Sequence, residues 1–206
     1  MAISTYSELK TAVADWLNRA DLTAAIPNFI QLAEAKFNRE LRTRQQVKRA
    51  YATLSGQYIQ IPTDWLEAIN LQLNVTPVRV LDFVTLDQAD RIRANRYGET
   101  NADAYTIVGE QLEVVPPVGA NTEIDMTYYM KIPALSDGNP TNWLLTAWPD
   151  LYVYATLVHA APYLREDERV ALWKGMADQL LEEIRLSDER AKHSGGPLRA
   201  RVRPIG

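Results

Sequence analysis

Three arginines near the end of the sequence, Arg199, Arg201 and Arg203, are spaced two residues apart. In an extended chain successive side chains point to opposite faces, so the three guanidinium groups would share one face and Leu198 and Val202 the other. Guanidinium groups bind carboxylates and phosphates through paired, charge-assisted hydrogen bonds. The pattern predicts a binding segment rather than a catalytic one, acting by strand addition to a partner or in an acidic groove on it.

The residues around these arginines set them apart from the rest of the chain. Gly195, Gly196 and Pro197 separate them from the preceding helix, and residues 192–206 contain one lysine, three arginines and no acidic residue. Since the whole chain has a formal net charge of −4, the remainder carries about −8. We predict an extended basic C-terminal arm, residues 192–206, the alternative being a solvated tail. The residues expected to bind the partner are Leu198, Arg199, Arg201, Val202, Arg203, Pro204 and Ile205.

A second group of cations lies at the end of a predicted helix. Cations there interact favourably with the helix dipole. Six cations within fourteen residues are more than the helix dipole requires. They are therefore also candidates for contact with nucleic acid or with an acidic neighbouring subunit. They are Lys36, Arg39, Arg42, Arg44, Lys48 and Arg49.

Catalytic chemistry has little support in the sequence. His159 lies in an apolar stretch without a nucleophile motif, and the chain has no cysteine. The acid pairs Asp167/Glu168 and Glu182/Glu183 are adjacent on a predicted helix, so their carboxylates point about 100° apart and do not converge. We therefore predict no enzyme activity, no metal site and no cofactor; a pocket of carboxylates with shifted pKa values would argue otherwise.

Helices are predicted at both ends of the chain. Thr5 and Glu8 have capping-box spacing before an apolar stripe. Pro27 suits the first turn of a second helix that runs to about Arg44, and the short link implies an antiparallel pair. Asn142 can cap a short helix. The stretch from Pro149 is apolar nearly all round, which predicts a central buried helix. Residues 166–191 are amphipathic. The stripe of the first helix is Leu9, Ala12, Val13, Trp16 and Leu17, and that of the last is Val170, Leu172 or Trp173, Met176, Leu180 or Leu181, and Ile184.

Alternating strands are predicted between these helices. The capping-box pair Thr85 and Gln88 opens a short helix to about Tyr97. The aromatic residues Trp65, Tyr128 and Tyr129 would suit a protein–protein interface if one sheet face is open. The expected strands are 47–54, then 58–61 after a turn at 55–57, and 67–74, 78–82, 104–108, 111–115 and 122–131.

Together these elements predict an α+β fold. An N-terminal helix pair and the C-terminal helices (residues 1–46 and 141–191) would form a helical bundle, with an inserted antiparallel β module at 47–140 and the extended arm at 192–206. No apolar run approaches a membrane span, and the N-terminus lacks the pattern of a signal peptide. We expect synthesis in a cytosol and no membrane partner.

Two blocks of the sequence resemble a known family. ISTYSELKTAVADWLNRADLTAAIPNFIQLAEAKFNRELR (3–42) and WLLTAWPDLYVYATLVHAAPYLREDERVALWKGMADQLLEEI (143–184) are similar to the head-to-tail adaptor, or connector, proteins of tailed bacteriophages. The blocks cover about 40% of the chain. WPDLYVYATL followed by APYLREDER is the more specific part.

The resemblance implies a structural virion protein at the head–tail junction, made in the bacterial host cytoplasm. Such adaptors form a ring, usually of twelve subunits, beneath the portal protein. Their C-terminal arms dock on the portal, a role that would fall here on Leu198–Ile205. The β module would contact tail or nozzle proteins or a neighbouring subunit. DNA would pass through the lumen without sequence-specific binding. The alternative function is a nucleic-acid-binding module using residues 36–49 and the arm.

Overall fold

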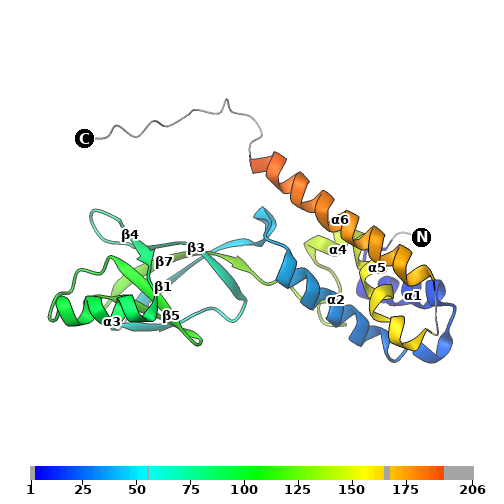
Figure 1. Ribbon diagram of the computed structural model, residues 1–206, viewed down its shortest axis with the longest axis horizontal. Coiled ribbons are helices and arrows are strands. Elements are labelled where there is room, and N and C mark those ends of the chain that lie inside the picture. Colours follow the sequence, from blue (N-terminus) through cyan, green and yellow to red (C-terminus); the bar gives the residue numbers. More distant parts are fainter. Residues whose placement is uncertain (1–2, 55, 165–167, 193–206) are drawn as a thin grey trace. The chain divides into compact units, whose positions relative to one another are not determined.

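The computed structural model describes residues 3–54, 56–164 and 168–192 (Figure 1). Within these residues the chain forms six α-helices, three short 3-10 helices and seven β-strands, which confirms the α+β class. The described residues up to Gln45 and those from Ile132 onward form a helical unit, and Gln46–Lys131 form a β unit. Of the predicted arm, residues 193–206 lie outside the described part.

The helical unit begins with α1 (Tyr6–Leu17) and α2 (Ile26–Glu40), linked through the 3-10 turn η1 (Ala20–Leu22). The predicted capping box is present: the Glu8 amide donates to Thr5 Oγ1 at 3.3 Å, and the Thr5 amide donates to the Glu8 carboxylate at 3.0 Å. Helix α2 ends at Glu40 rather than near Arg44, because Leu41 adopts extended backbone ahead of the 3-10 turn η2 (Arg44–Gln46).

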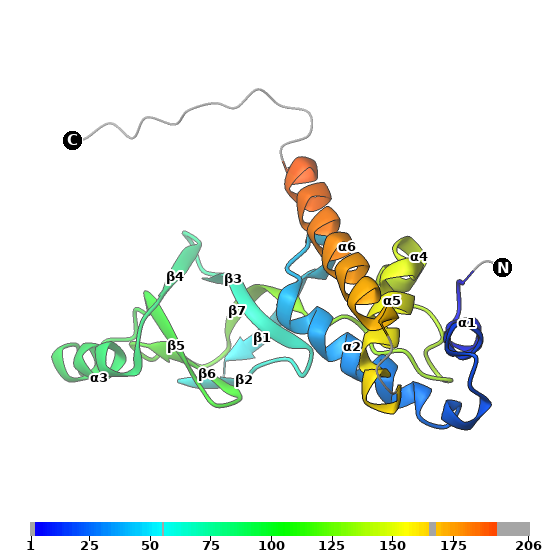
Figure 2. The same cartoon turned by 45° about the vertical axis from the view of Figure 1, so that its right-hand side comes forward.

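The C-terminal half adds α4 (Trp143–Ala147), α5 (Pro149–His159), η3 (Ala161–Tyr163) and α6 (Arg169–Lys192). Asn142 caps α4, since the Leu145 amide donates to Asn142 Oδ1 at 2.8 Å. Helix α5 packs against α1, α2, α4 and α6 and is largely buried, as its apolar sequence predicted (Figure 2). The core of this unit is therefore built around α5.

Helix α6 buries a narrower stripe than the sequence suggested. Of the alternatives Leu172 or Trp173 and Leu180 or Leu181, the buried residues are Trp173 and Leu181. Ala177 and Ile184 are buried with them. Leu172 is 62% exposed and Met176 is 37% exposed, so the prediction that Met176 belongs to the buried stripe was wrong. The helix is held against α5 by every third or fourth residue, and its other apolar side chains remain at the surface.

The segment after the β unit belongs to the helical unit from Ile132, whereas the sequence pattern had assigned residues up to 140 to the β module. Ile132 and Leu135 are buried in the helical core. The Leu135 amide donates to the buried Glu34 carboxylate at 2.8 Å, and the Tyr152 hydroxyl donates to the same oxygen at 3.2 Å. These contacts fasten the returning chain to α2 and α5.

The β unit is a seven-stranded sheet in the order β1-β7-β3-β4-β5-β6-β2. β1 pairs with β7 and β2 with β6, so these consecutive strands do not pair with each other. One expectation about the sheet was wrong. β4 and β5 pair in parallel, so the module is not wholly antiparallel. The strands are β1 (Val47–Leu54), β2 (Tyr58–Gln60), β3 (Trp65–Leu73), β4 (Arg79–Phe83), β5 (Ala104–Val108), β6 (Gln111–Val115) and β7 (Thr122–Met130).

Aromatic residues contribute to a mainly aliphatic core in the β unit. The rings of Trp65 and Tyr128 stack with centroids 4.7 Å apart, and both side chains are buried, so they are unavailable to a partner. Tyr129 is half-buried. Helix α3 (Leu86–Asn95) packs on β5 and β6 and starts at the predicted capping box of Thr85 and Gln88.

Candidate functional site

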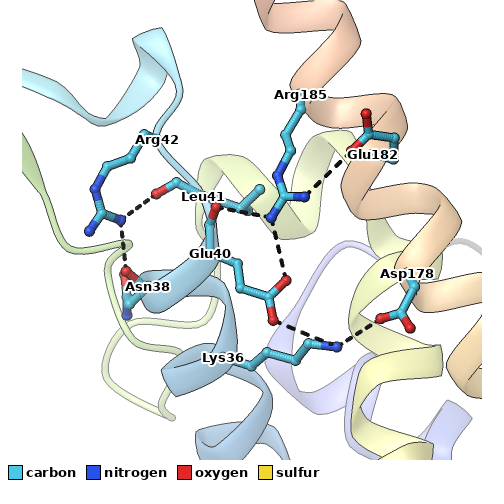
Figure 3. A network of polar contacts seen from close by, with 8 residues as sticks. All are labelled: Lys36, Asn38, Glu40, Leu41, Arg42, Asp178, Glu182 and Arg185. Atoms are coloured by element: carbon cyan, nitrogen blue, oxygen red, sulfur yellow. Dashed lines mark hydrogen bonds and ion pairs between the residues drawn. The ribbon is translucent and has the colours of Figure 1, made fainter.

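The basic run of residues 36–49 is divided between the two units, and part of it forms an ion-pair network between α2 and α6. Lys36 Nζ lies 2.9 Å from Asp178 Oδ1 and 3.9 Å from Glu40 Oε1. Arg185 lies 3.6 Å from Glu40 and 3.4 Å from Glu182 (Figure 3). Lys36 therefore joins two helices of its own chain.

Arg42 satisfies the C-terminal end of α2. Its Nη1 donates to the main-chain carbonyls of Asn38 at 2.9 Å and Leu41 at 2.7 Å (Figure 3). The last carbonyls of a helix have no partner within the helix, and a half-buried guanidinium supplies one here. Arg42 therefore interacts favourably with the C-terminal end of the α2 dipole.

The chain beyond α2 is held to α6 through Asp188. This carboxylate is 6% exposed, and its Oδ1 accepts a 2.8 Å hydrogen bond from the main-chain amide of Arg44. Lys192 Nζ lies 3.1 Å from Asp188 Oδ2. The contact uses the backbone of Arg44, which leaves its guanidinium at the surface.

Arg39 and Arg44 are the two cations of the run that stay available. Both side chains are exposed, and neither guanidinium has a hydrogen-bond or ion-pair partner among the described residues. Within the helical unit these two arginines keep their full hydrogen-bonding capacity for a phosphate or an acidic partner.

The remaining two cations, Lys48 and Arg49, lie on β1 and contact carboxylates of the β unit. Lys48 Nζ is 2.7 Å from Asp64, and Arg49 Nε is 3.5 Å from the buried Asp125. Asp64 also accepts a 2.9 Å hydrogen bond from the Tyr128 hydroxyl. Although burial opposes it, the bonds from Lys48 and Tyr128 hold the pKa of Asp64 below its usual value. Both cations thus support the sheet.

The residues considered for catalysis do not come together as a site where the structure describes them. His159 ends α5, and burial lowers its pKa, with the charges of Lys36 and Arg39 acting in the same direction. Glu182 is paired with Arg185, and Glu183 accepts a 2.8 Å hydrogen bond from Gln179.

The other acid pair is described only in part. Glu168 is exposed, and Asp167 lies outside the described residues. The described residues contain no group of three histidine or acidic side chains placed to hold a metal ion. They also contain no helix that is long and apolar enough to cross a membrane.

One carboxylate does have a raised pKa. Burial raises the pKa of Glu34, against the lowering effect of the Leu135 amide and the Tyr152 hydroxyl. Asn142 Nδ2 in turn donates to the Tyr152 hydroxyl at 2.7 Å. This network links α2, α5 and the segment before α4, so the shift reflects a structural role inside the core.

The structure also shows a surface that the sequence analysis missed. Trp16 was predicted to face the core but is 48% exposed, because Leu9, Val13 and Leu17 occupy the buried face of α1. The Trp16 ring lies nearly perpendicular to that of Tyr154, with the two centroids 5.7 Å apart, and it borders a groove of about 490 Å³ between α1 and α5. This groove, called the Trp16 groove below, is also lined by Thr146, Pro149, Asp150 and Val153.

The sequence contained a partial signal for this groove. By helical spacing, Trp16 lies at the edge of the apolar stripe that Leu9, Val13 and Leu17 form. The apolar stripe alone does not distinguish a core residue from an exposed one, because the exposure of each side chain on α1 depends on which of them α5 covers. The partner-binding residues proposed for the arm, Leu198–Ile205, lie outside the described residues.

Comparison with known proteins gives one family. The sequence model of the SU10 adaptor protein family matches residues 4–201, which span both structural units and reach into the predicted arm. No curated protein matches the chain.

Proposed function

Because the chain belongs to the SU10 adaptor protein family, we propose that it is a structural virion protein of a tailed bacteriophage that forms a ring between the portal and the tail. The observation that carries this proposal is the extent of the family match, residues 4–201, which includes the helical unit, the β unit and part of the arm. Membership of an adaptor family indicates a role in assembly rather than catalysis, and a place at the head–tail junction.

The proposed assembly gives each part of the chain a task. The arm docks on the portal through Leu198, Arg199, Arg201, Val202, Arg203, Pro204 and Ile205. The helical unit packs into the ring, usually of twelve copies in adaptors of this kind. The β unit offers contacts to tail or nozzle proteins or to a neighbouring subunit. The acidic body lets DNA pass through the lumen without binding, because phosphates and carboxylates repel each other.

Docking of the arm is supported by its charge and by the way α6 ends. Helix α6 finishes at Lys192, whose ammonium group is anchored to Asp188 at 3.1 Å. This ion pair holds the last described turn of α6 together. The family match ends at Arg201, so it includes Leu198, Arg199 and Arg201 but not Val202–Ile205.

Co-sedimentation with the cognate portal ring tests this function. The full chain is compared with a truncation after Lys192, which preserves α6 and the contact between Lys192 and Asp188, and with a truncation after Arg201. The proposal predicts that the full chain binds, that the shorter truncation loses binding, and that the longer one retains a part. Equal binding by all three chains would move the contact to the helical or β unit.

The nucleic-acid-binding alternative receives less support from the contacts. Lys36, Lys48 and Arg49 are paired with carboxylates, and Arg42 binds main-chain carbonyls. Only Arg39 and Arg44 of that run retain free guanidinium groups within the described residues. Salt-dependent binding of DNA by the isolated protein would favour this alternative. The slope of the logarithm of the binding constant against the logarithm of the salt concentration reports the number of phosphates contacted.

A further inference from the structure

Two exposed apolar surfaces of the helical unit are left uncovered by the residues that the structure describes. One is the Trp16 groove, where the indole of Trp16 stands half out of the surface beside Tyr154, Val153 and Pro149. The groove is open along one side, and its volume of about 490 Å³ is sufficient for several aliphatic side chains. Exposed apolar patches of this kind mark interaction sites on soluble proteins.

The other surface runs along α6. Leu172 and Met176 are one turn apart, and Leu186 returns to nearly the same face four turns after Leu172. We call these three residues the Leu172 stripe. Their exposed fractions are 62%, 37% and 48%. By helical spacing the stripe lies on a different flank of α6 from Asp178 and Arg185, which contact α2.

The two surfaces are on different sides of the helical unit. Helix α5 packs against both α1 and α6, and it lies between them in the bundle (Figure 2). The groove is formed where α1 meets α5, and the stripe is on the outer side of α6. When two patches on different sides of one chain meet in a head-to-tail contact, the contact closes into a ring if the rotation between copies allows it, whereas a two-fold contact would stop at a dimer.

One exposed charge beside each surface has the opposite sign, while Glu183 on the stripe side of α6 accepts a hydrogen bond from Gln179. Asp150 lines the groove, and its carboxylate has no ion-pair partner among the described residues. Arg190, one turn after Leu186, is exposed and is likewise unpaired within that part of the chain. An arginine that follows the stripe could therefore meet a carboxylate at the groove of another copy.

We propose that the Leu172 stripe of one copy docks in the Trp16 groove of the next copy. The partner of the groove is thus a second copy of this chain, and the contact forms the subunit interface of the ring. This inference rests on the proposed function, since it identifies the surfaces by which the ring is built.

Disulfide trapping tests the interface cleanly, because the natural chain contains no cysteine. Thr146→Cys places a thiol in the groove, and Glu183→Cys places one on the stripe side of α6; both side chains are exposed. The double variant is oxidised on portal rings and also alone at high concentration, and then analysed without reductant. The inference predicts a ladder of products longer than dimers.

Three controls show whether the contact is specific and head-to-tail. A mixture of the two single variants should stop at dimers, because each chain carries one thiol. The pair Thr146→Cys and Lys174→Cys, with Lys174 exposed on another flank of α6, should give no ladder. Adding Leu172→Gln and Met176→Gln to the trapping pair should reduce the ladder at least tenfold while leaving the thermal melt unchanged, since both side chains are exposed.

The outcomes separate this inference from the proposed function. Portal binding without a ladder would overturn the interface and leave the adaptor function standing. A ladder in the protein alone, without portal binding, would support the interface and count against the portal role. If neither portal binding nor a ladder is found, both are wrong.

Discussion

Lys36 on α2 and Asp178 on α6 form an ion pair of 2.9 Å between residues 142 positions apart in the sequence. A lysine that the sequence presented as one of six clustered cations is thus committed to a contact within the helical unit. The same pair connects the first helix pair to the helix that leads into the arm.

The energetic contribution of this pair should be small. The Lys36 and Asp178 side chains are 24% and 50% exposed, and exposed pairs are screened by solvent. A double-mutant cycle with Lys36→Met and Asp178→Asn, measured by urea denaturation, should give a coupling energy of about 0.2–1 kcal/mol. The reversed pair, Lys36→Asp with Asp178→Lys, should recover only part of the coupling, because the new carboxylate at position 36 lies one turn before Glu40. A coupling above about 3 kcal/mol would mean that the pair is buried in solution.

The core carboxylate Glu34 should make stability depend on pH. Burial raises its pKa in the folded state, so the folded protein binds this proton more tightly than the unfolded chain. The resulting stability is complete below the unfolded pKa and is lost as pH rises through the folded pKa. Glu34→Gln keeps an acceptor for the Leu135 amide and the Tyr152 hydroxyl, so it should be more stable than the natural protein at neutral pH.

Glu34→Ala is the matched control for that prediction. It leaves the buried Leu135 amide and Tyr152 hydroxyl without their acceptor, which should cost about 1–3 kcal/mol. Chemical denaturation of the three proteins from pH 4 to pH 8 provides the measurement. A Glu34→Gln profile that keeps the pH dependence of the natural protein would show that Glu34 is not the titrating group.

Asp64 should make stability depend on pH in the opposite direction to Glu34. Its pKa is lowered in the folded state, so its contribution is present above the unfolded pKa and is lost as pH falls through the folded pKa. Asp64→Ala removes the partner of Lys48 and of the buried Tyr128 hydroxyl and should cost about 1–3 kcal/mol at neutral pH. Asp64→Asn retains an acceptor for Tyr128 and should cost less. Equal losses in the two variants would contradict the role given to the Tyr128 hydrogen bond.

Two tryptophans of the helical unit should respond very differently to truncation. Trp173 is 3% exposed, and Trp173→Ala should cost about 3–5 kcal/mol through lost burial and a cavity. Trp16 is half exposed, and Trp16→Ala should cost about 1 kcal/mol, close to the value of its edge-to-face contact with Tyr154. Thermal melts compare them directly. A loss at Trp16 as large as that at Trp173 would place Trp16 in the core, as the sequence pattern had suggested.

Local features of the fold could be predicted from the sequence, and long-range pairings could not. The capping boxes at Thr5 and Thr85 and the buried α5 follow from residues a few positions apart. The partner of β1 does not, because Val47 pairs with Tyr129 across most of the β unit. A short turn at 55–57 favours a hairpin locally, yet the sheet places β1 beside β7 and β2 beside β6.

The same limit applies to the candidate site. The clustering of cations between Lys36 and Arg49 was evident in the sequence, but their partners were not. Asp178 lies on a distant helix, and Asp125 lies on a neighbouring strand. Only the structure shows that Arg39 and Arg44 have no ion-pair partner among the described residues, whereas the other cations of the run already have polar partners. The exposure of Trp16 could not be predicted for a related reason. Periodicity identifies the apolar face of a helix, but it does not show which residues of that face another helix covers.

The most direct test of the adaptor function is the mass of the complex formed on an isolated portal ring. Single-particle mass measurement with the full chain, of 23.3 kDa, should show one discrete species heavier than the portal by about twelve chains. The truncation after Lys192 should leave the mass of the portal unchanged. A portal whose mass stays the same with the full chain, at concentrations where the chain is folded, would contradict the account.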